Sequence, residues 1–194
     1  MTWGSLDGLR RRLDAVDAAP TSAGGSDLRP AAVLVPVLMD DDGAHLLFTV
    51  RSRHLPHHAG QIAFPGGALE GRESVEQAAL REAYEEVGLE VPDGAILGRL
   101  SPLPSPAGYL ATPVVAAFPR PTRWTLDPGE VEEAFTVPLH ELEGTVPERE
   151  VRTFRGAPRA IHRYRWRDRD IWGFTGNVLR EFLERLRADR GGTA

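Results

Sequence analysis

Three glutamates, Glu82, Glu85 and Glu86, lie within five residues of one another in the segment 66–89, GGALEGRESVEQAALREAYEEVGL. On a helix that turns about 100° per residue they converge on one side, and Arg81 lies one turn before Glu85, where it can pair with it. Carboxylates this close repel one another unless a cation lies among them. A hard divalent cation such as Mg²⁺ or Mn²⁺ prefers carboxylate and carbonyl oxygens, whereas zinc fits less well. The simpler alternative, a solvated acidic helix with arginine partners, stays open on these acids alone.

The limits of the helix that carries these acids are encoded locally. Ser74 followed three residues later by Gln77 forms a capping box, so the helix is predicted to begin directly after Ser74. Gly88 is well placed to end it, because glycine adopts the left-handed conformation at a helix C-terminus. Small and apolar residues recur on one arc of this helix, and Glu82 and Glu86 lie at its edge. We therefore expect these two carboxylates to be partly buried.

Strands are expected to outnumber helices in the rest of the chain, which favours a mixed sheet with helices packed on it. Two Val-rich runs joined by Asp-Asp-Asp-Gly predict a hairpin of buried strands, and Pro36 inside the first run suggests an edge or a bulge. Arginine alternates at 163, 165, 167 and 169, which is typical of a strand with a solvated face. The expected strands are 31–39, 44–50, 95–100, 112–118, 149–155 and 160–168, and residues 130–142 are expected to run from a short strand into a turn of helix. The expected amphipathic helices are 5–16 and 175–187.

Composition excludes several classes of function. The 194 residues, 41% of them hydrophobic and 26% charged, suffice for one sizeable core, and we divide the chain into an N-terminal helix with linker (1–30) and a main domain (31–194). Cysteine is absent, which removes disulfides, cysteine metal ligands and cysteine nucleophiles. No apolar run is long enough to span a bilayer and the first residues lack a signal-peptide core, so the expected location is cytoplasmic, without a membrane partner. The net charge of −5 argues against nucleic acid as a partner.

The acidic helix belongs to a longer pattern: Gly67, five residues, Glu73, seven residues, and then REAYEEVGL from Arg81 to Leu89. This pattern resembles the box of the Nudix hydrolase family at every defined position. The resemblance implies an α/β/α sandwich around a mixed β-sheet and hydrolysis of a nucleoside diphosphate linked to another group. It also implies dependence on Mg²⁺ or Mn²⁺. Pyrophosphate hydrolysis suits such an ion, since a bound cation neutralises the oxygens and activates water.

Carried over position by position, the resemblance assigns roles to the residues of the box. Glu82, Glu85 and Glu86 would be metal ligands, Glu73 and Arg81 a supporting pair, and the carbonyl oxygen of Gly66 a further ligand. A general base is also needed, and either a helix glutamate or a loop acid can supply it. Our candidate for the loop acid is Glu130, in the segment DPGEVEEAF, against the alternative of a solvated loop carboxylate.

The segment before the box, LFTVRSRHLPHHAGQIAFPGG, resembles the upstream signature of the coenzyme A pyrophosphatase subgroup. One position departs from that signature, because Pro56 stands where the subgroup has a second arginine, and Arg53 is the neighbour able to substitute for it. The resemblance implies cleavage of coenzyme A to 3′,5′-ADP and 4′-phosphopantetheine. Arginines beside the metal helix suit a diphosphate and a 3′-phosphate. The residues expected to bind the substrate are Arg51, Ser52, Arg53, Gly60 and Phe64.

Two other functions stay open at this point. One is a Nudix enzyme that acts on ADP-ribose, NADH or a similar dinucleotide, and the other is a non-catalytic nucleotide-sensing module, which would be expected to lack a box acid. The histidines His54, His57 and His58 have no acids at ligand spacing and do not indicate a zinc site. The expected partner is a small nucleotide substrate, and the sequence leaves the oligomeric state open, a homodimer included.

Overall fold

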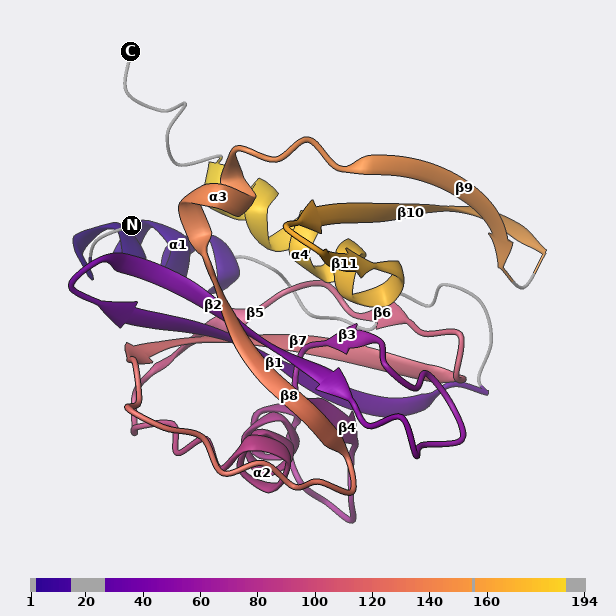
Figure 1. Cartoon of the computed structure of the whole chain (residues 1–194), viewed down its shortest axis with the longest axis horizontal. Helices are drawn as coiled ribbons and strands as arrows, with labels where there is room; N and C mark the ends of the chain where they lie inside the picture. The colour runs from indigo at the N-terminus through magenta and orange to yellow at the C-terminus, as the bar shows by residue number, and fades with distance from the viewer. Residues whose placement is uncertain (1–2, 15–26, 155, 188–194) are drawn as a thin grey trace.

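A mixed eight-stranded sheet forms the centre of the structure, a computed structural model that describes residues 3–14, 27–154 and 156–187 (Figure 1). The strand order along the main path is β3-β2-β1-β7-β5, while β4 pairs with β1, β6 with β7 and β8 with β2. The strands are β1 (Arg29–Asp40), β2 (Gly43–Arg51), β3 (Ile62–Ala63), β4 (Gly66–Ala68), β5 (Ile96–Arg99), β6 (Leu103–Pro104), β7 (Tyr109–Pro119) and β8 (Val131–Pro138).

Strand β1 is the centre of this sheet and is buried on both faces. It runs parallel to β7 and antiparallel to β2 and β4. Val35 and Val37 point into the core on one side of the sheet, whereas Leu34 and Leu38 point into the core on the other. A strand covered on both faces has a continuous apolar sequence, which explains the Val-rich pattern of this segment.

Pro36 lies in the middle of β1, so the prediction of an edge position is wrong. The proline is nevertheless accommodated, because β1 pairs with β4 through Ala31–Val33 and with β2 only from Val37 onward. The N–H of Leu34, two residues before the proline, donates to the carbonyl of Pro65 on this side of the strand. Backbone amides alternate along a strand, so the missing N–H of Pro36 falls in the gap between two partner strands.

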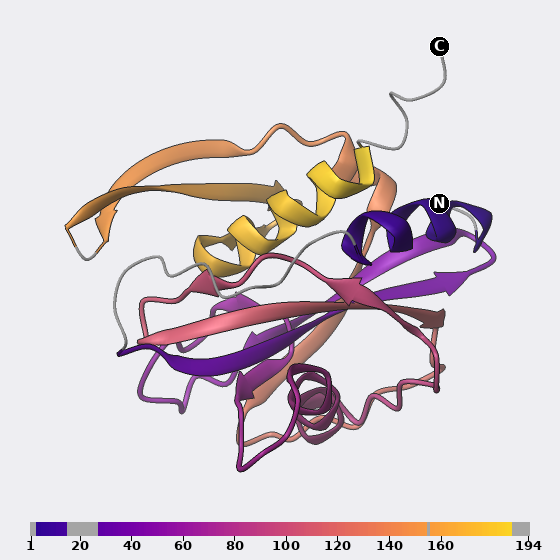
Figure 2. The ribbon, with the colours of Figure 1, turned by 180° about the vertical axis from the view of Figure 1, so that it is seen from behind.

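Helices cover the sheet on both faces, which confirms the predicted α/β/α sandwich (Figures 1 and 2). Helix α2 (Val75–Val87) packs on one face; α1 (Trp3–Asp14) and α4 (Gly173–Arg187) lie on the other. Leu6, Leu9 and Leu13 of α1 join the same buried cluster as the β1 valines and α4. The short helix α3 (Leu139–Glu143) follows β8, as the sequence predicts for residues 130–142.

A second, three-stranded sheet follows α3 and extends away from the sandwich (Figure 1). It consists of β9 (Glu148–Phe154), β10 (Ala157–Trp166) and β11 (Arg169–Trp172) in antiparallel order. The four alternating arginines do not share one strand as predicted, because Arg167 has a positive φ of 54° in the turn between β10 and β11. Short strands β3, β4, β6 and β11 were not predicted, since two to four residues carry too little periodicity.

The remaining predicted elements agree with the structure within a few residues. Helix α1 ends at Asp14 among the described residues, and Val16 of the predicted helix lies outside them, as does most of the predicted linker. The division of the chain at residue 30 stays a prediction. No helix in the described ranges is long and apolar enough to cross a membrane.

Candidate active site

Helix α2 begins and ends where the sequence predicts. The Ser74 hydroxyl accepts from the N–H of Gln77, and the Gln77 side chain accepts from the N–H of Ser74, so both halves of the capping box form. Gly88 adopts the left-handed conformation at φ 65° and closes the C-terminus through its N–H. A helix fixed at both ends holds its side chains at defined positions along the sheet.

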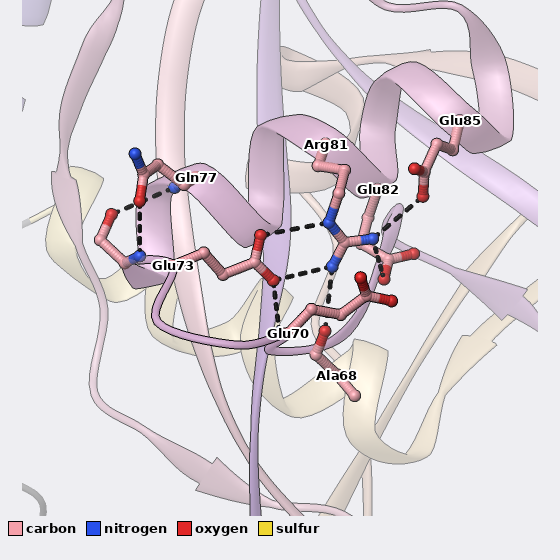
Figure 3. A network of polar contacts seen from close by, with 8 residues as sticks. Ala68, Glu70, Glu73, Gln77, Arg81, Glu82 and Glu85 are labelled. Atoms are coloured by element: carbon pink, nitrogen blue, oxygen red, sulfur yellow. Dashed lines mark hydrogen bonds and ion pairs between the residues drawn. The ribbon is translucent and has the colours of Figure 1, made fainter.

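Arg81 is the centre of a network that joins the box residues (Figure 3). Its guanidinium donates to both oxygens of Glu73 at 2.9 and 3.1 Å, to Glu82 at 2.9 Å and to Glu85 at 3.0 Å. It also donates to the carbonyl of Ala68 at 3.1 Å. The hydrogen bonds from Arg81 lower the pKa of Glu73, and the acids around Arg81 raise its own pKa, first through Glu73. The predicted pairs of Arg81 with Glu73 and Glu85 are therefore formed.

Glu86 is the acid that the fold buries most, with only 3% of its surface exposed. Burial raises the pKa of its carboxyl to about 8, and the charges of Glu82 and Glu130 act in the same direction. The charge of Arg51 and a hydrogen bond from the backbone of Gly66 oppose this rise. A carboxyl held this way strongly favours a cationic partner, because ionisation without one costs desolvation energy.

Gly66 and Gly67, at the start of the box, allow the backbone of β4 to approach both β1 and the acids. A Cβ on Gly66 would overlap the backbone of Val33 and the carbonyl of Ala32, and a Cβ on Gly67 would overlap the carboxylate of Glu82. Glu82 is thus packed directly against the Cα of Gly67, and its burial raises its pKa. Only glycine permits this contact between strand and helix.

Glu130 reaches the same region from a loop that is tied down at both ends. The N–H of Asp127 donates to the Glu86 carbonyl at 3.0 Å, and the N–H of Ser52 donates to the Glu130 carbonyl at 2.8 Å. These bonds link the loop to the end of α2 and to the end of β2. The charge of Glu130 raises the pKa values of both Glu82 and Glu86. The side chain predicted as a loop acid is therefore close enough to interact with the box acids.

A cleft of about 450 Å³ opens beside these acids, between the main sheet and the start of α4. Glu82, Glu130 and Arg51 line it together with the backbone of the two glycines. This volume lies within the range of small-molecule sites. Its other walls consist of small and aliphatic residues together with four aromatic ones: Phe64, Tyr109, Trp172 and Phe174.

The residues predicted to bind substrate do not all reach the cleft. Arg51 and Phe64 line it. Ser52 is buried, and its hydroxyl accepts from the N–H of His54 in the turn after β2. Gly60 closes the loop that follows this turn, since its N–H donates to the Arg51 carbonyl. Arg53 departs from the expected position, because its side chain is 80% exposed and pairs with Glu132 at 3.2 Å outside the cleft lining.

The donor set fits a hard divalent cation in its chemistry. Glu82 and Glu86 interact electrostatically beside the cleft, and the backbone of Gly66 lies next to them. Within the described ranges, however, no three acid or histidine side chains are already grouped as metal ligands. Glu85 is 57% exposed, and its Oε2 accepts from Arg81 at 3.0 Å.

Several cleft residues escaped the sequence reasoning, among them three aromatic ones: Tyr109, Trp172 and Phe174. Each lies at the end of an element, far in sequence from the box. The segments SPAGYLATPVV and DIWGFTGNVL, which resemble the same subgroup, contain all three residues and were the available signal. His58 also lines the cleft, and its Nδ1 lies 2.9 Å from Gln61 Oε1.

Comparison with known proteins places the chain in a family. A model of the NUDIX domain matches residues 28–157. An uncharacterized Nudix hydrolase, NudL, of Photorhabdus laumondii is 36% identical over 160 residues, which is 81% of this chain and 85% of that protein. The peroxisomal coenzyme A diphosphatase ndx-8 of Caenorhabditis elegans is 42% identical over 146 residues, or 72% of this chain, but the match spans only 60% of the nematode protein.

Solved structures agree on the fold. The MutT protein of Methanosarcina mazei superposes with a TM-score of 0.56 at 18% identity, covering 86% of this chain and 99% of that one. A MutT/nudix family protein of Enterococcus faecalis gives a TM-score of 0.58 at 15% identity, covering 85% of this chain and 64% of that one. Members of the family generally use divalent metal ions. The chain therefore belongs to the Nudix hydrolase family and is a pyrophosphohydrolase.

Proposed function

We propose that this enzyme hydrolyses the diphosphate of coenzyme A, or of its derivatives, to 3′,5′-ADP and 4′-phosphopantetheine with Mg²⁺ or Mn²⁺. The observation that carries the proposal is the convergence of two adjacent motifs, the upstream signature and the box, on one cleft. Arg51 and Phe64 belong to the upstream signature, Glu82 belongs to the box, and all three line the same cavity. The nematode relative, a coenzyme A diphosphatase by name, supports the same substrate.

In this proposal each acid of the box has a defined task. Glu82, Glu85, Glu86 and the carbonyl of Gly66 hold the metal ion, which when bound neutralises the diphosphate oxygens and acidifies a water molecule. Arg81 and Glu73 are positioning residues, since they orient Glu82 and Glu85 through the hydrogen bonds described above.

Other residues of the cleft act on substrate and water. Arg51 carries a fixed positive charge at the end of β2 and interacts with Glu86, so it can pair with a diphosphate oxygen. Glu130 accepts the proton of the attacking water, whose oxygen forms the new P–O bond as the bridging P–O bond breaks. Phe64 forms part of an apolar wall.

The test compares purified wild-type protein with Glu86→Gln on four substrates: coenzyme A, an acyl-coenzyme A, NADH and ADP-ribose. Each is incubated with Mg²⁺ or with Mn²⁺, and the products are separated chromatographically. We expect 3′,5′-ADP and 4′-phosphopantetheine from coenzyme A, and a loss of about 10²- to 10³-fold in kcat for Glu86→Gln. Glu90→Gln is the matched control, since Glu90 is an exposed carboxylate just beyond the same helix.

Three outcomes would overturn the proposal in different ways. Much faster turnover of ADP-ribose or NADH than of coenzyme A would assign the enzyme to the dinucleotide substrates instead. Equal activity of Glu86→Gln and wild type would remove Glu86 from the metal site, whichever substrate is used. Absence of turnover on all four substrates would favour the nucleotide-sensing alternative.

A further inference from the structure

The three-stranded sheet carries a positive charge that contrasts with the rest of the molecule. The segment 148–172 contains eight arginines and four acids, although the whole chain has a net charge of −5. Strand β9 is exposed along almost its full length, so this sheet contributes little to the core. The β9–β10 hairpin extends beyond the sandwich on the side where β1 and β7 begin (Figures 1 and 2).

The register of this sheet gathers two arginines around one tryptophan. Arg163 pairs directly with Trp172, and the β9 pairing brings Arg152 to the same face. The guanidinium carbon of Arg163 lies 5.2 Å from the centre of the Trp172 ring, and that of Arg152 lies 5.9 Å from it. Cations at these distances are attracted to the face of an indole ring.

Trp172 also lines the cleft, so the cationic face of the small sheet adjoins the candidate active site. The acids of the cleft and Arg51 lie at α2, the end of β2 and the loop at Glu130. Arg163 and Arg152 lie outside the cleft lining, against the ring of Trp172, and add a second, separate group of positive charge. A substrate that needs a cation at its diphosphate and carries a second, remote phosphate would match this separation.

The acid partners of these arginines leave donors available. Arg163 binds Asp170 through Nη1 alone, at 2.7 Å, and Arg152 binds Glu150 through Nε and Nη2. A guanidinium has five N–H donors, so among the described residues both arginines keep donors that no recorded hydrogen bond uses. A bidentate contact to phosphate needs two such donors.

We propose that Arg163 and Arg152, beside Trp172, bind a phosphate monoester on the ribose of the substrate, namely the 3′-phosphate of coenzyme A, with the adenine against Trp172. The inference rests on the proposed function and names the residues that would make the enzyme specific for a substrate with a 3′-phosphate. It also replaces Arg53, which points away from the cleft, as the contact for this phosphate.

The experiment measures kcat/KM for coenzyme A and for dephospho-coenzyme A, which lacks only the 3′-phosphate. The variants are Arg163→Gln, Arg152→Gln and the charge-conserving Arg163→Lys. Arg149→Gln is the matched control: it removes the same charge from β9, but Arg149 pairs with His162 and lies on the opposite face of the sheet. Calorimetric binding of 3′,5′-ADP and of 5′-AMP provides a second measurement that does not depend on turnover.

We expect the preference for coenzyme A over dephospho-coenzyme A to fall by roughly 10- to 100-fold in Arg163→Gln and by less in Arg152→Gln and Arg163→Lys. Arg149→Gln should retain the wild-type preference. The same variants should lose the preference for 3′,5′-ADP over 5′-AMP. A preference that changes less than about twofold in both glutamine variants would overturn the assignment while leaving the proposed hydrolysis intact. Failure of wild type to hydrolyse either substrate would refute the proposed function, and the binding measurement would then decide on the phosphate site alone.

Discussion

Glu86 makes the stability of the metal-free protein depend on pH in a direction opposite to that of most carboxylates. Its pKa rises from 4.5 to about 8 on folding because the side chain is buried at 3% exposure. Between these two values the folded state keeps a proton that the unfolded state has lost. Linkage then requires the free energy of unfolding to fall as pH rises through this window.

The size of the effect follows from the two pKa values. At about 1.4 kcal/mol per pH unit, the difference between 4.5 and about 8 corresponds to on the order of 5 kcal/mol above pH 8. Glu86→Gln removes the titration and keeps nearly the same volume. We therefore expect the variant to become progressively more stable than wild type between about pH 5 and pH 8, with the two profiles parallel above that range.

The assay is urea denaturation in EDTA, followed by circular dichroism at several pH values from 5 to 9. Glu90→Gln serves as the control with the same change in formal charge, and its profile should follow that of wild type. Excess Mg²⁺ should then stabilise wild type most at alkaline pH and Glu86→Gln much less. Parallel profiles of wild type and Glu86→Gln from pH 5 to 8 would refute the claim that burial holds this carboxyl protonated.

Three further substitutions test the elements that position the site. Gly67→Ala should displace the Glu82 carboxylate and lower kcat by at least about 10-fold in a protein that still folds. Steady-state kinetics measures kcat and circular dichroism checks the fold; a wild-type kcat would contradict the close packing of Glu82 against Gly67. Arg81→Lys should lower the free energy of unfolding by about 1–3 kcal/mol in denaturant titrations, because one ammonium cannot bridge Glu73 and Glu82 as the guanidinium does. An unchanged denaturation midpoint would count against a stabilising role of this network. Leu9→Ala should cost about 2–5 kcal/mol in a single unfolding transition seen by calorimetry, whereas two separate transitions would make α1 an independent unit.

The box helix could be predicted almost completely from the sequence because its determinants are local. The capping box and Gly88 act within four residues of the helix ends, and the turn of the helix fixes which acids lie together. Glu82 and Glu86 were placed at the border of the packed face, and both have raised pKa values in the structure. The contact of Arg81 with Glu85 followed from the same periodicity, whereas the contact with Glu73 was implied by the family resemblance.

The substrate side of the cleft could not be predicted in the same way. Alternation along a strand would put Arg51 and Arg53 on one side, but β2 ends at Arg51 with a shift of register, and the following turn directs Arg53 to Glu132. Pro36 was misplaced for a related reason, since a gap between two partner strands is visible only once the sheet is assembled.

By itself the sequence determined the acids, their spacing, the helix that carries them and the main strands of a mixed sheet, while the α/β/α sandwich was implied by the family resemblance. The helix and the strands depend on hydrogen bonds or periodicity within a short stretch of chain. Only the tertiary structure decided how deeply Glu86 is buried, and that Tyr109 and Trp172 meet in one cleft. Burial and proximity of this kind depend on strand order, register and packing, and these bring together residues that are distant in sequence.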